Sequence, residues 1–161
     1  MKKILFRAKR TDTGEWLQGY IIVAEKDAPY IIPSKSWASA PRNSHSIYSS
    51  NFYRVDPETV GQYTGLTDKN GTKIFEGDII EFEDLGEEGW EYKEGFDFTN
   101  RARITLENYR VELTRWYSDN SAVLDDMENY YDCFIDMFKR CEVIGNIYDT
   151  PELLKGGADD E

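Results

Sequence analysis

The chain has 161 residues, with 19 Lys and Arg and 31 Asp and Glu, which gives a formal net charge of −12. This excess of acid argues against a general nucleic-acid binder or a protein that docks on an anionic membrane, because both need clustered Lys and Arg. Two cysteines, Cys133 and Cys141, are too few for a disulfide framework and lack zinc-ligand spacing. We therefore expect structural thiols in an intracellular protein without a signal peptide or a membrane-spanning segment.

The chain opens with a predicted β-hairpin. β-Formers at residues 4–10 lead into a turn cluster at 11–14, and a second run of β-formers follows at 15–23. Residues 30–32, closed by Pro33, predict a third strand.

Residues 34–51 change in composition to Ser, Asn, Ala and Pro. We expect a long loop there, and His45, the only histidine, lies within it. Strand character returns at residues 52–55.

The segment from 55 to 81 alternates turn residues with short apolar runs. We expect a strand over 59–63 and a hairpin turn at 68–71, where Asn70 and Gly71 tolerate a positive φ. A bend at 76–78 would then pass the chain from one strand to the next, because Gly lets the backbone turn a corner of a small barrel.

An acidic and aromatic segment follows. Residues 81–97 hold eight acids against the single base Lys93, with Trp and Tyr between them. Dense like charge disfavours compaction, so we expect an exposed insertion over 82–98, either a solvated loop or a contact surface for a basic partner. The candidate partner surface consists of Glu87, Glu88, Trp90, Glu91, Tyr92 and Glu94.

The last third predicts two strands, a helix and a final strand. Residues 101–107 and 109–117 alternate polar and apolar side chains, with Ile104 and Leu106 on one face and Val111 and Leu113 on another. Apolar residues at three- and four-residue steps predict a helix over 121–139.

The chain then ends with three short predicted features. Residues 142–148 predict the last strand, and residues 150–154 a helical turn with Pro at its first position. Residues 156–161 predict a disordered tail.

We find no residue pattern that specifies a reaction. Glu76 and Asp78 could share a strand face as paired carboxylates, but a hydrogen bond from the turn backbone to Asp78 explains that residue more simply. The sequence around Asp68 resembles a fragment of a calcium loop without its later Glu, and we interpret it as a turn. We interpret His45 as a loop residue, so the sequence predicts no catalytic, cofactor or metal site.

Three blocks of the sequence are similar to a known family. TVGQYTGLTDKNGTKIFEGDII at 59–80, ILFRAK at 4–9 and VIGNIYDTPELL at 143–154 resemble the signatures of the YopX family of small bacteriophage and prophage proteins. The resemblance implies a mainly β fold with an SH3-like barrel as its core, and it carries over no catalytic residues. The fold-signature residues are Gly61, Tyr63, Gly65, Asp68, Asn70, Gly71, Glu76, Gly77, Asp78, Gly145 and Asn146.

We therefore expect one YopX-like domain over residues 1–155, an SH3-like barrel with extra hairpins and one helix in its C-terminal half. The predicted function is a cytoplasmic phage or prophage accessory protein in a bacterial host, acting by protein–protein contact or self-assembly, without cofactor, direct nucleic-acid binding or small-molecule ligand. An alternative is an acidic decoy that binds a nucleic-acid-binding host protein. An enzyme with an unrecognised site is the third hypothesis.

Overall fold

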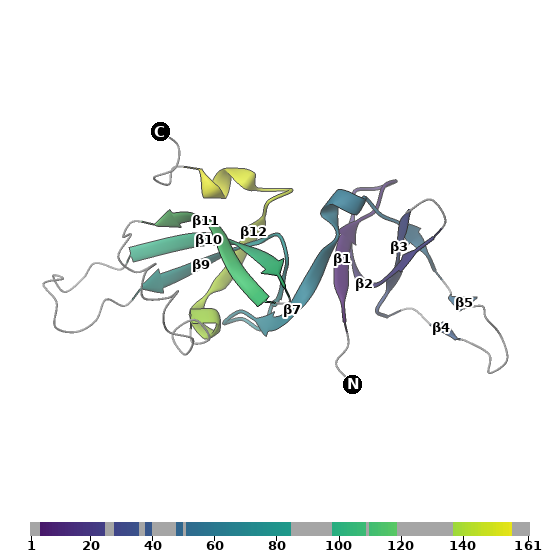
Figure 1. Ribbon diagram of the computed structural model, residues 1–161, viewed down its shortest axis with the longest axis horizontal. Helices are drawn as coiled ribbons and strands as arrows, with labels where there is room; N and C mark the ends of the chain where they lie inside the picture. Colours follow the sequence, from purple (N-terminus) through teal and green to yellow (C-terminus); the bar gives the residue numbers. More distant parts are fainter. Residues whose placement is uncertain are drawn as a thin grey trace, which may run out of the picture. The chain divides into compact units, whose positions relative to one another are not determined.

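The structure is a computed structural model, shown in Figure 1. It describes residues 4–24, 28–35, 38–39, 48–49, 51–84, 98–108, 110–118 and 137–155. The chain divides into two compact units, residues 1–63 (unit 1) and residues 64–161 (unit 2). We describe each unit by itself.

Unit 1 is an antiparallel sheet. Its strands, in spatial order, are β6, β3, β2, β1 and the first residues of β7. The predicted hairpin is confirmed, since Lys9 lies opposite Trp16 and the Gly14 N–H donates to the Arg10 carbonyl at 3.0 Å. The strand bounds are β1 Phe6–Lys9, β2 Trp16–Val23, β3 Pro29–Pro33, β6 Tyr53–Arg54 and β7 Gly61–Thr67.

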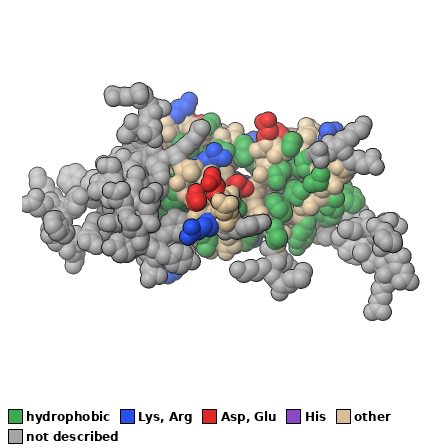
Figure 2. All heavy atoms as spheres, viewed as in Figure 1, with side chains coloured by type: hydrophobic (Ala, Val, Ile, Leu, Met, Phe, Trp, Pro, Cys, Tyr) green, Lys and Arg blue, Asp and Glu red, His purple; other side chains and the backbone are tan. Residues whose placement is uncertain are grey.

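The core of unit 1 lies against one face of this sheet. Ala8, Ile31 and Val55 are buried there, and Leu17, Ile21, Tyr53 and Val60 pack against them. Figure 2 shows hydrophobic side chains gathered over strands β1 to β3 on the face in view.

Within residues 34–51, two short strands pair with each other. They are β4 (Ala38–Ser39) and β5 (Tyr48–Ser49), and Ala38 lies opposite Ser49. His45 lies outside the described residues.

The strand predicted from residue 59 begins two residues later, at Gly61. The 3-10 helix η2 (Pro57–Thr59) takes its place, because Pro57 favours a first helical position and the Asp56 side chain accepts the Glu58 N–H at 3.1 Å. The Thr59 hydroxyl donates to the Asp56 carbonyl at 2.8 Å and accepts the Lys9 N–H at 2.9 Å. This turn is therefore hydrogen-bonded to β1.

Unit 2 is built on a four-stranded antiparallel sheet in the order β11, β10, β9, β12. The second part of β7 pairs with β8 (Lys73–Phe75), as the predicted turn at 68–71 requires. The remaining strand bounds are β9 Asp78–Asp84, β10 Phe98–Glu107, β11 Arg110–Ser118 and β12 Glu142–Asn146.

The hairpin of β10 and β11 brings the predicted apolar positions to one face rather than two. Glu107 lies opposite Arg110, so the turn is tight, and Ile104 then lies opposite Leu113 and Leu106 opposite Val111. Directly opposed residues of an antiparallel pair share a face. The buried core of unit 2 lies on this face and consists of Ile74, Ile80, Phe82, Ala102, Ile104, Met137, Phe138 and Cys141.

The fold is mainly β, with two antiparallel sheets and little helix in the part of the chain that is described. The SH3-like barrel is not confirmed, because neither sheet closes on itself there, and β11 and β12 are the edges of the four-stranded sheet. Of the helix predicted over 121–139, residues 137–139 are described and are helical, and the helix extends to residue 140. The helical turn predicted after Thr150 is the 3-10 helix η3 (Pro151–Leu154).

Two regions and the domain boundary of the predicted organisation remain predictions. The tip of the acidic insertion, residues 85–97, and the tail at 156–161 lie outside the described residues. Asp84 and Phe98, at the ends of the tip, are opposed in the pairing of β9 with β10, so the tip connects a hairpin. The single domain over 1–155 is also untested. Among the residues described, no helix is both long and apolar enough to cross a membrane.

Candidate functional site

Asp68 binds the β7–β8 turn to the last strand. Its side chain is 5% exposed, and one carboxylate oxygen accepts the N–H groups of Asn70 at 2.9 Å and Thr72 at 2.8 Å. The other oxygen accepts the Val143 N–H at 3.1 Å, which joins the turn to β12. Burial opposes the charged form, but these three backbone donors outweigh it and hold the pKa of Asp68 below its ordinary value. The carboxylate therefore acts as a turn ligand, as the sequence interpretation expected.

Cys141 lies beside this turn and is a structural thiol. Its carbonyl accepts the Lys69 N–H at 3.0 Å, and its Sγ donates to the Phe138 carbonyl at 3.3 Å. Burial, followed by the charge of Asp68, raises the pKa of the thiol to about 12. A thiol held in its protonated form is a poor nucleophile. Cys133 lies outside the described residues.

The bend from β8 to β9 uses Asp78 in the same way. Asp78 is 1% exposed, and its Oδ2 accepts the Phe75 N–H at 2.6 Å, which is the predicted hydrogen bond to the turn backbone. Gly77, with φ +83°, donates its N–H to the Ile104 carbonyl at 2.9 Å. The buried Asp78 and the half-buried Glu76 therefore flank a turn. In the described part of the chain, no group of three or more His, Cys, Asp and Glu is placed to hold a metal ion.

Asn146 closes the turn that follows β12. Its side-chain oxygen accepts the N–H groups of Tyr148 and Asp149, both at 3.0 Å, and its amide donates to the Asp149 carboxylate at 3.0 Å. The Thr150 hydroxyl accepts the Asn146 N–H at 3.1 Å and donates to the Asn146 carbonyl at 3.2 Å. A Cβ on Gly145 would lie 2.1 Å from the Thr150 Oγ1, so only Gly fits there.

These last two turns are in direct contact. The Ile147 N–H donates to the Gly77 carbonyl at 3.0 Å, and a Cβ on Gly77 would lie 3.1 Å from a ring carbon of Tyr148. The bend at Gly77 and the turn after β12 therefore hold each other in unit 2. The polar side chains of these turns satisfy backbone groups, which gives a physical reason for the residue types.

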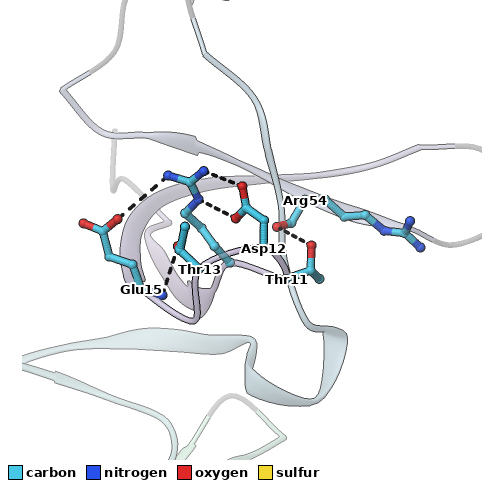
Figure 3. Close-up of polar contacts among 6 residues, drawn as sticks. Thr11, Asp12, Thr13, Glu15 and Arg54 are labelled. Atoms are coloured by element: carbon cyan, nitrogen blue, oxygen red, sulfur yellow. Dashed lines mark hydrogen bonds and ion pairs between the residues drawn. The ribbon is translucent and has the colours of Figure 1, made fainter.

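A second polar cluster lies at the tip of the β1–β2 hairpin (Figure 3). The Arg10 guanidinium donates to both carboxylate oxygens of Asp12, at 2.8 and 2.6 Å, and lies 3.8 Å from the Glu15 carboxylate. It also stacks over the Tyr53 ring, 4.2 Å from its centroid. The hydrogen bond from Arg10 holds the pKa of Asp12 below its ordinary value. This charge is neutralised within the hairpin.

The opposite face of the unit 1 sheet has a different character. Alternation along the strands and the register of their pairs place one set of side chains on the face away from the core residues Ala8 and Ile31. This set is Arg7, Lys9, Trp16, Gln18, Tyr20, Ile22, Tyr30, Ile32 and Arg54, and Ile32 is buried. We call its basic and aromatic members, Arg7, Lys9, Trp16, Tyr20, Tyr30 and Arg54, the cationic face. Figure 3 shows the Arg54 side chain pointing away from the Arg10 cluster.

Trp16 contacts both bases of β1. The Arg7 guanidinium carbon lies 4.9 Å, and the Lys9 ammonium 5.3 Å, from the centroid of its ring. Both are cation–π distances. The strands β1, β2, β3 and β6 contain no Asp or Glu.

Charge and exposed apolar surface divide between the two units. Residues 1–63 contain nine Lys and Arg and six Asp and Glu, which gives a net charge of +3. Residues 64–161 contain ten Lys and Arg and twenty-five Asp and Glu, which gives a net charge of −15. The exposed large hydrophobic side chains in the described residues are Ile4, Tyr20, Val23 and Phe52, all in unit 1. Unit 1 is therefore the basic and surface-apolar part of an acidic chain.

The structure joins the signature turns at 68–71 and 76–78 to the segment 143–147, and it does not test the predicted partner surface. Glu87, Glu88, Trp90, Glu91, Tyr92 and Glu94 lie outside the described residues. The sequence interpretation missed the cationic face. Two features of the sequence could have predicted it. Arg7 and Lys9 are two residues apart in a strand, so they share a face, and the hairpin turn places Lys9 opposite Trp16.

Comparison with known proteins identifies the family. The family model described as YopX protein matches residues 5–155. The chain is also similar to the crystal structure of protein EF1440 from Enterococcus faecalis, with 21% identity and a TM-score of 0.54, over 96% of this chain and 100% of that one. At this identity the likeness shows the fold alone. No curated protein matches the chain. The family match covers nearly the whole chain, and the chain therefore belongs to the YopX family.

Proposed function

We propose that the chain is a phage or prophage accessory protein that works in the cytoplasm of a bacterial host by contact with other protein chains, including copies of itself. The observation that carries the proposal is the surface of unit 1. Its described residues expose Tyr20, Val23 and Phe52, and three bases, Arg7, Lys9 and Arg54, share one face of its sheet. Aromatic and Arg side chains of this kind are enriched at protein interfaces.

A contact function is also supported by the structural role of the polar signature residues, which is to hold turns. Asp68, Asp78 and Asn146 accept backbone N–H groups of their own turns. Side chains used in this way are not available to bind a substrate without breaking the turn. The fold is thus a scaffold, and its function lies in the surfaces that it presents.

Sedimentation velocity over a wide range of protein concentration tests the proposal, together with capture of partners from infected cells on the immobilised chain. We expect either a concentration-dependent rise in the weight-average sedimentation coefficient or a partner that binds saturably and reversibly. A chain that sediments as a monomer throughout and captures no saturable partner contradicts the proposal.

The acidic decoy remains a second candidate, and the net charge of −15 on residues 64–161 favours it. Such a surface would compete with nucleic acid for a basic protein. Replacing Glu87, Glu88, Glu91 and Glu94 by Gln should abolish binding to a nucleic-acid-binding host protein. Unchanged affinity of that variant contradicts the decoy.

We also infer that unit 2 is an opened relative of the SH3-like barrel. The support is the packing of Ile74 of β8 against Ile80, Ala102 and Ile104, which lays the β7–β8 hairpin on the face of the four-stranded sheet. An experimental structure tests this directly. Strands β7 and β8 detached from that face would contradict it.

A further inference from the structure

We propose that Arg103, on the face of the unit 2 sheet that η3 contacts, binds a carboxylate of the acidic segment 156–161 of the same chain. This inference goes beyond the proposed contact function and does not depend on it. The observation that points to it is the Arg103 Nε, which is buried and has no hydrogen-bond partner among the residues described. A buried donor without a partner is rare in a folded protein, so this one calls for an acceptor.

Arg103 differs from its neighbour Arg101 in the residues that lie opposite it. Both arginines lie on the same face of β10, because they are two residues apart in the strand. Arg101 is opposite Glu81, and its Nε donates to that carboxylate at 2.8 Å. Arg103 is opposite Ile79 in β9 and Thr114 in β11, and neither side chain has a carboxylate. The opposing strands therefore provide an anion for Arg101 and none for Arg103.

The 3-10 helix η3 lies on the same face of the sheet. Gly145 is opposite Ile79, and Ile79 is opposite Arg103, so these three residues share a face. A Cβ on Gly145 would lie 2.9 Å from the Leu153 Cδ1 of η3. The helix η3 also contacts β10 and β11. Arg103 is therefore a half-buried base on a face that η3 covers in part.

The occupant follows from the residues that come after η3. The described residues run to Lys155, and residues 156–161 read GGADDE, with three acids and no base. Six extended residues span up to about 20 Å, which is roughly four strand spacings, so these acids can reach the strands that η3 contacts. Two glycines precede the acids and leave the backbone free to turn back.

A tethered carboxylate is favoured over an anion from solution. The two oxygens of a carboxylate match the fork of a guanidinium, and a short flexible tether holds them at an effective concentration on the order of mM. Nucleic acid is disfavoured because residues 64–161 have a net charge of −15. Docking fixes a single acid, so it differs from the predicted disordered tail at that acid only.

A double-mutant cycle measured by urea unfolding of the full chain tests the inference. One variant is Arg103→Gln, and the tail variant carries Asp159→Asn, Asp160→Asn and Glu161→Gln. Neutralising three acids also relieves repulsion in an acidic chain, so the informative quantity is the difference between backgrounds. Relative to their effect in Arg103→Gln, we expect the tail substitutions to raise the unfolding equilibrium constant of the unsubstituted chain by about threefold. Equal effects in the two backgrounds would overturn the inference.

Arg110→Gln is the matched control background. Arg110 is an exposed base of β11 on the same face as Thr114 and Arg103, and its substitution removes the same charge as Arg103→Gln. We expect the tail substitutions to act in Arg110→Gln as they do in the unsubstituted chain. If Arg110→Gln abolishes the coupling as Arg103→Gln does, the effect is one of net charge and the inference is wrong.

The NMR signal of the Arg103 Nε–H gives a readout that a change in overall stability does not move. The signal is identified by its loss in Arg103→Lys. We expect the tail variant to shift it and to speed its exchange with water, whereas the Nε–H of Arg101, bound to Glu81, keeps its shift. The tail variant leaves every described residue in place, so this test holds even if Arg103→Gln does not fold. An Arg103 signal that the tail variant leaves unchanged contradicts the proposal.

Two further outcomes would assign a different acceptor. Glu112 lies opposite Thr105, one position along the same face, and coupling of Glu112→Gln with Arg103→Gln in place of the tail would make Glu112 the acceptor. Coupling that increases with protein concentration would assign the carboxylate to a second copy of the chain. Either result overturns the inference and leaves the proposed contact function standing.

Discussion

At the level of single residues, the polar side chains of the family signature accept hydrogen bonds from backbone N–H groups. The Asp68 carboxylate accepts three N–H groups from two parts of unit 2, and the side-chain oxygen of Asn146 accepts two within one turn. Each buried or half-buried carboxylate and amide of this kind removes the cost of an unsatisfied donor, which is about 1–3 kcal/mol per group. The identity of these residues is thus explained by the fold.

Gly71 provides a direct test of the β7–β8 turn. Its φ is +79° and nothing lies within 4 Å of the position of a Cβ, so a substitution is penalised by backbone strain alone. We expect Gly71→Val to lower the free energy of unfolding by about 1–2 kcal/mol. Gly71→Asn is the control, and it should cost less because Asn tolerates this conformation. Equal unfolding midpoints in urea for Val and Asn would contradict the turn.

Asp68 makes the stability of the chain depend on acid pH. Its pKa is lowered in the folded chain, so the stabilisation is present above the ordinary Asp pKa of about 3.9 and is lost as the pH falls through the lower folded value. We expect the difference in free energy of unfolding between the unsubstituted chain and Asp68→Asn to shrink as the pH falls below about 4. Urea unfolding across that range measures it. A difference that stays constant with pH would contradict this role of the carboxylate.

At the scale of elements, short turns and caps decide where each strand begins. The sequence around residue 59 has β-formers, but Asp56 and Pro57 favour a helical turn and the strand starts later. Similarly, Asn108 takes the left-handed conformation, φ +48°, in the turn that pairs Ile104 with Leu113. Local chemistry of this kind overrides propensity over one or two residues.

Thr59 tests how η2 is attached to β1. The residue is 5% exposed, and its hydroxyl bridges the Asp56 carbonyl and the Lys9 N–H. Thr59→Val keeps the shape and leaves the Lys9 N–H without this acceptor, so we expect a loss of about 1–3 kcal/mol in the free energy of unfolding. Thr59→Ser keeps the hydroxyl and should lose less. A Val variant as stable as the Ser variant would show that the hydroxyl is unimportant.

The sequence predicted the strands and turns of unit 2 well because alternation and Gly-containing turns are local signals. It predicted the hairpin of β1 and β2 for the same reason. It did not predict that Asp68 reaches Val143, because that contact joins residues 75 positions apart and depends on the packing of the sheet. It also missed the cationic face, since Arg7 and Trp16 meet only through the hairpin register.

At the scale of the whole molecule, charge is divided unevenly along the chain. The net charge of −15 on residues 64–161 opposes compaction of that part, and at physiological ionic strength salt screens the repulsion between exposed charges more than about 8 Å apart. We expect added NaCl to raise the melting temperature of the monomeric chain at low protein concentration. A melting temperature that does not respond to salt would mean that the acids are already dispersed or paired.

We propose that the signature residues within unit 2 hold its fold and that other surfaces make the contact with partners. The most direct test is the self-association constant of Asn146→Ala, measured by sedimentation velocity at a temperature where circular dichroism shows the variant folded. We predict a lower melting temperature, since three hydrogen bonds of the Asn146 side chain are lost, and an association constant within about twofold of that of the unsubstituted chain. A tenfold or greater weakening of association, about 1.4 kcal/mol, with an unchanged melting temperature would contradict the claim.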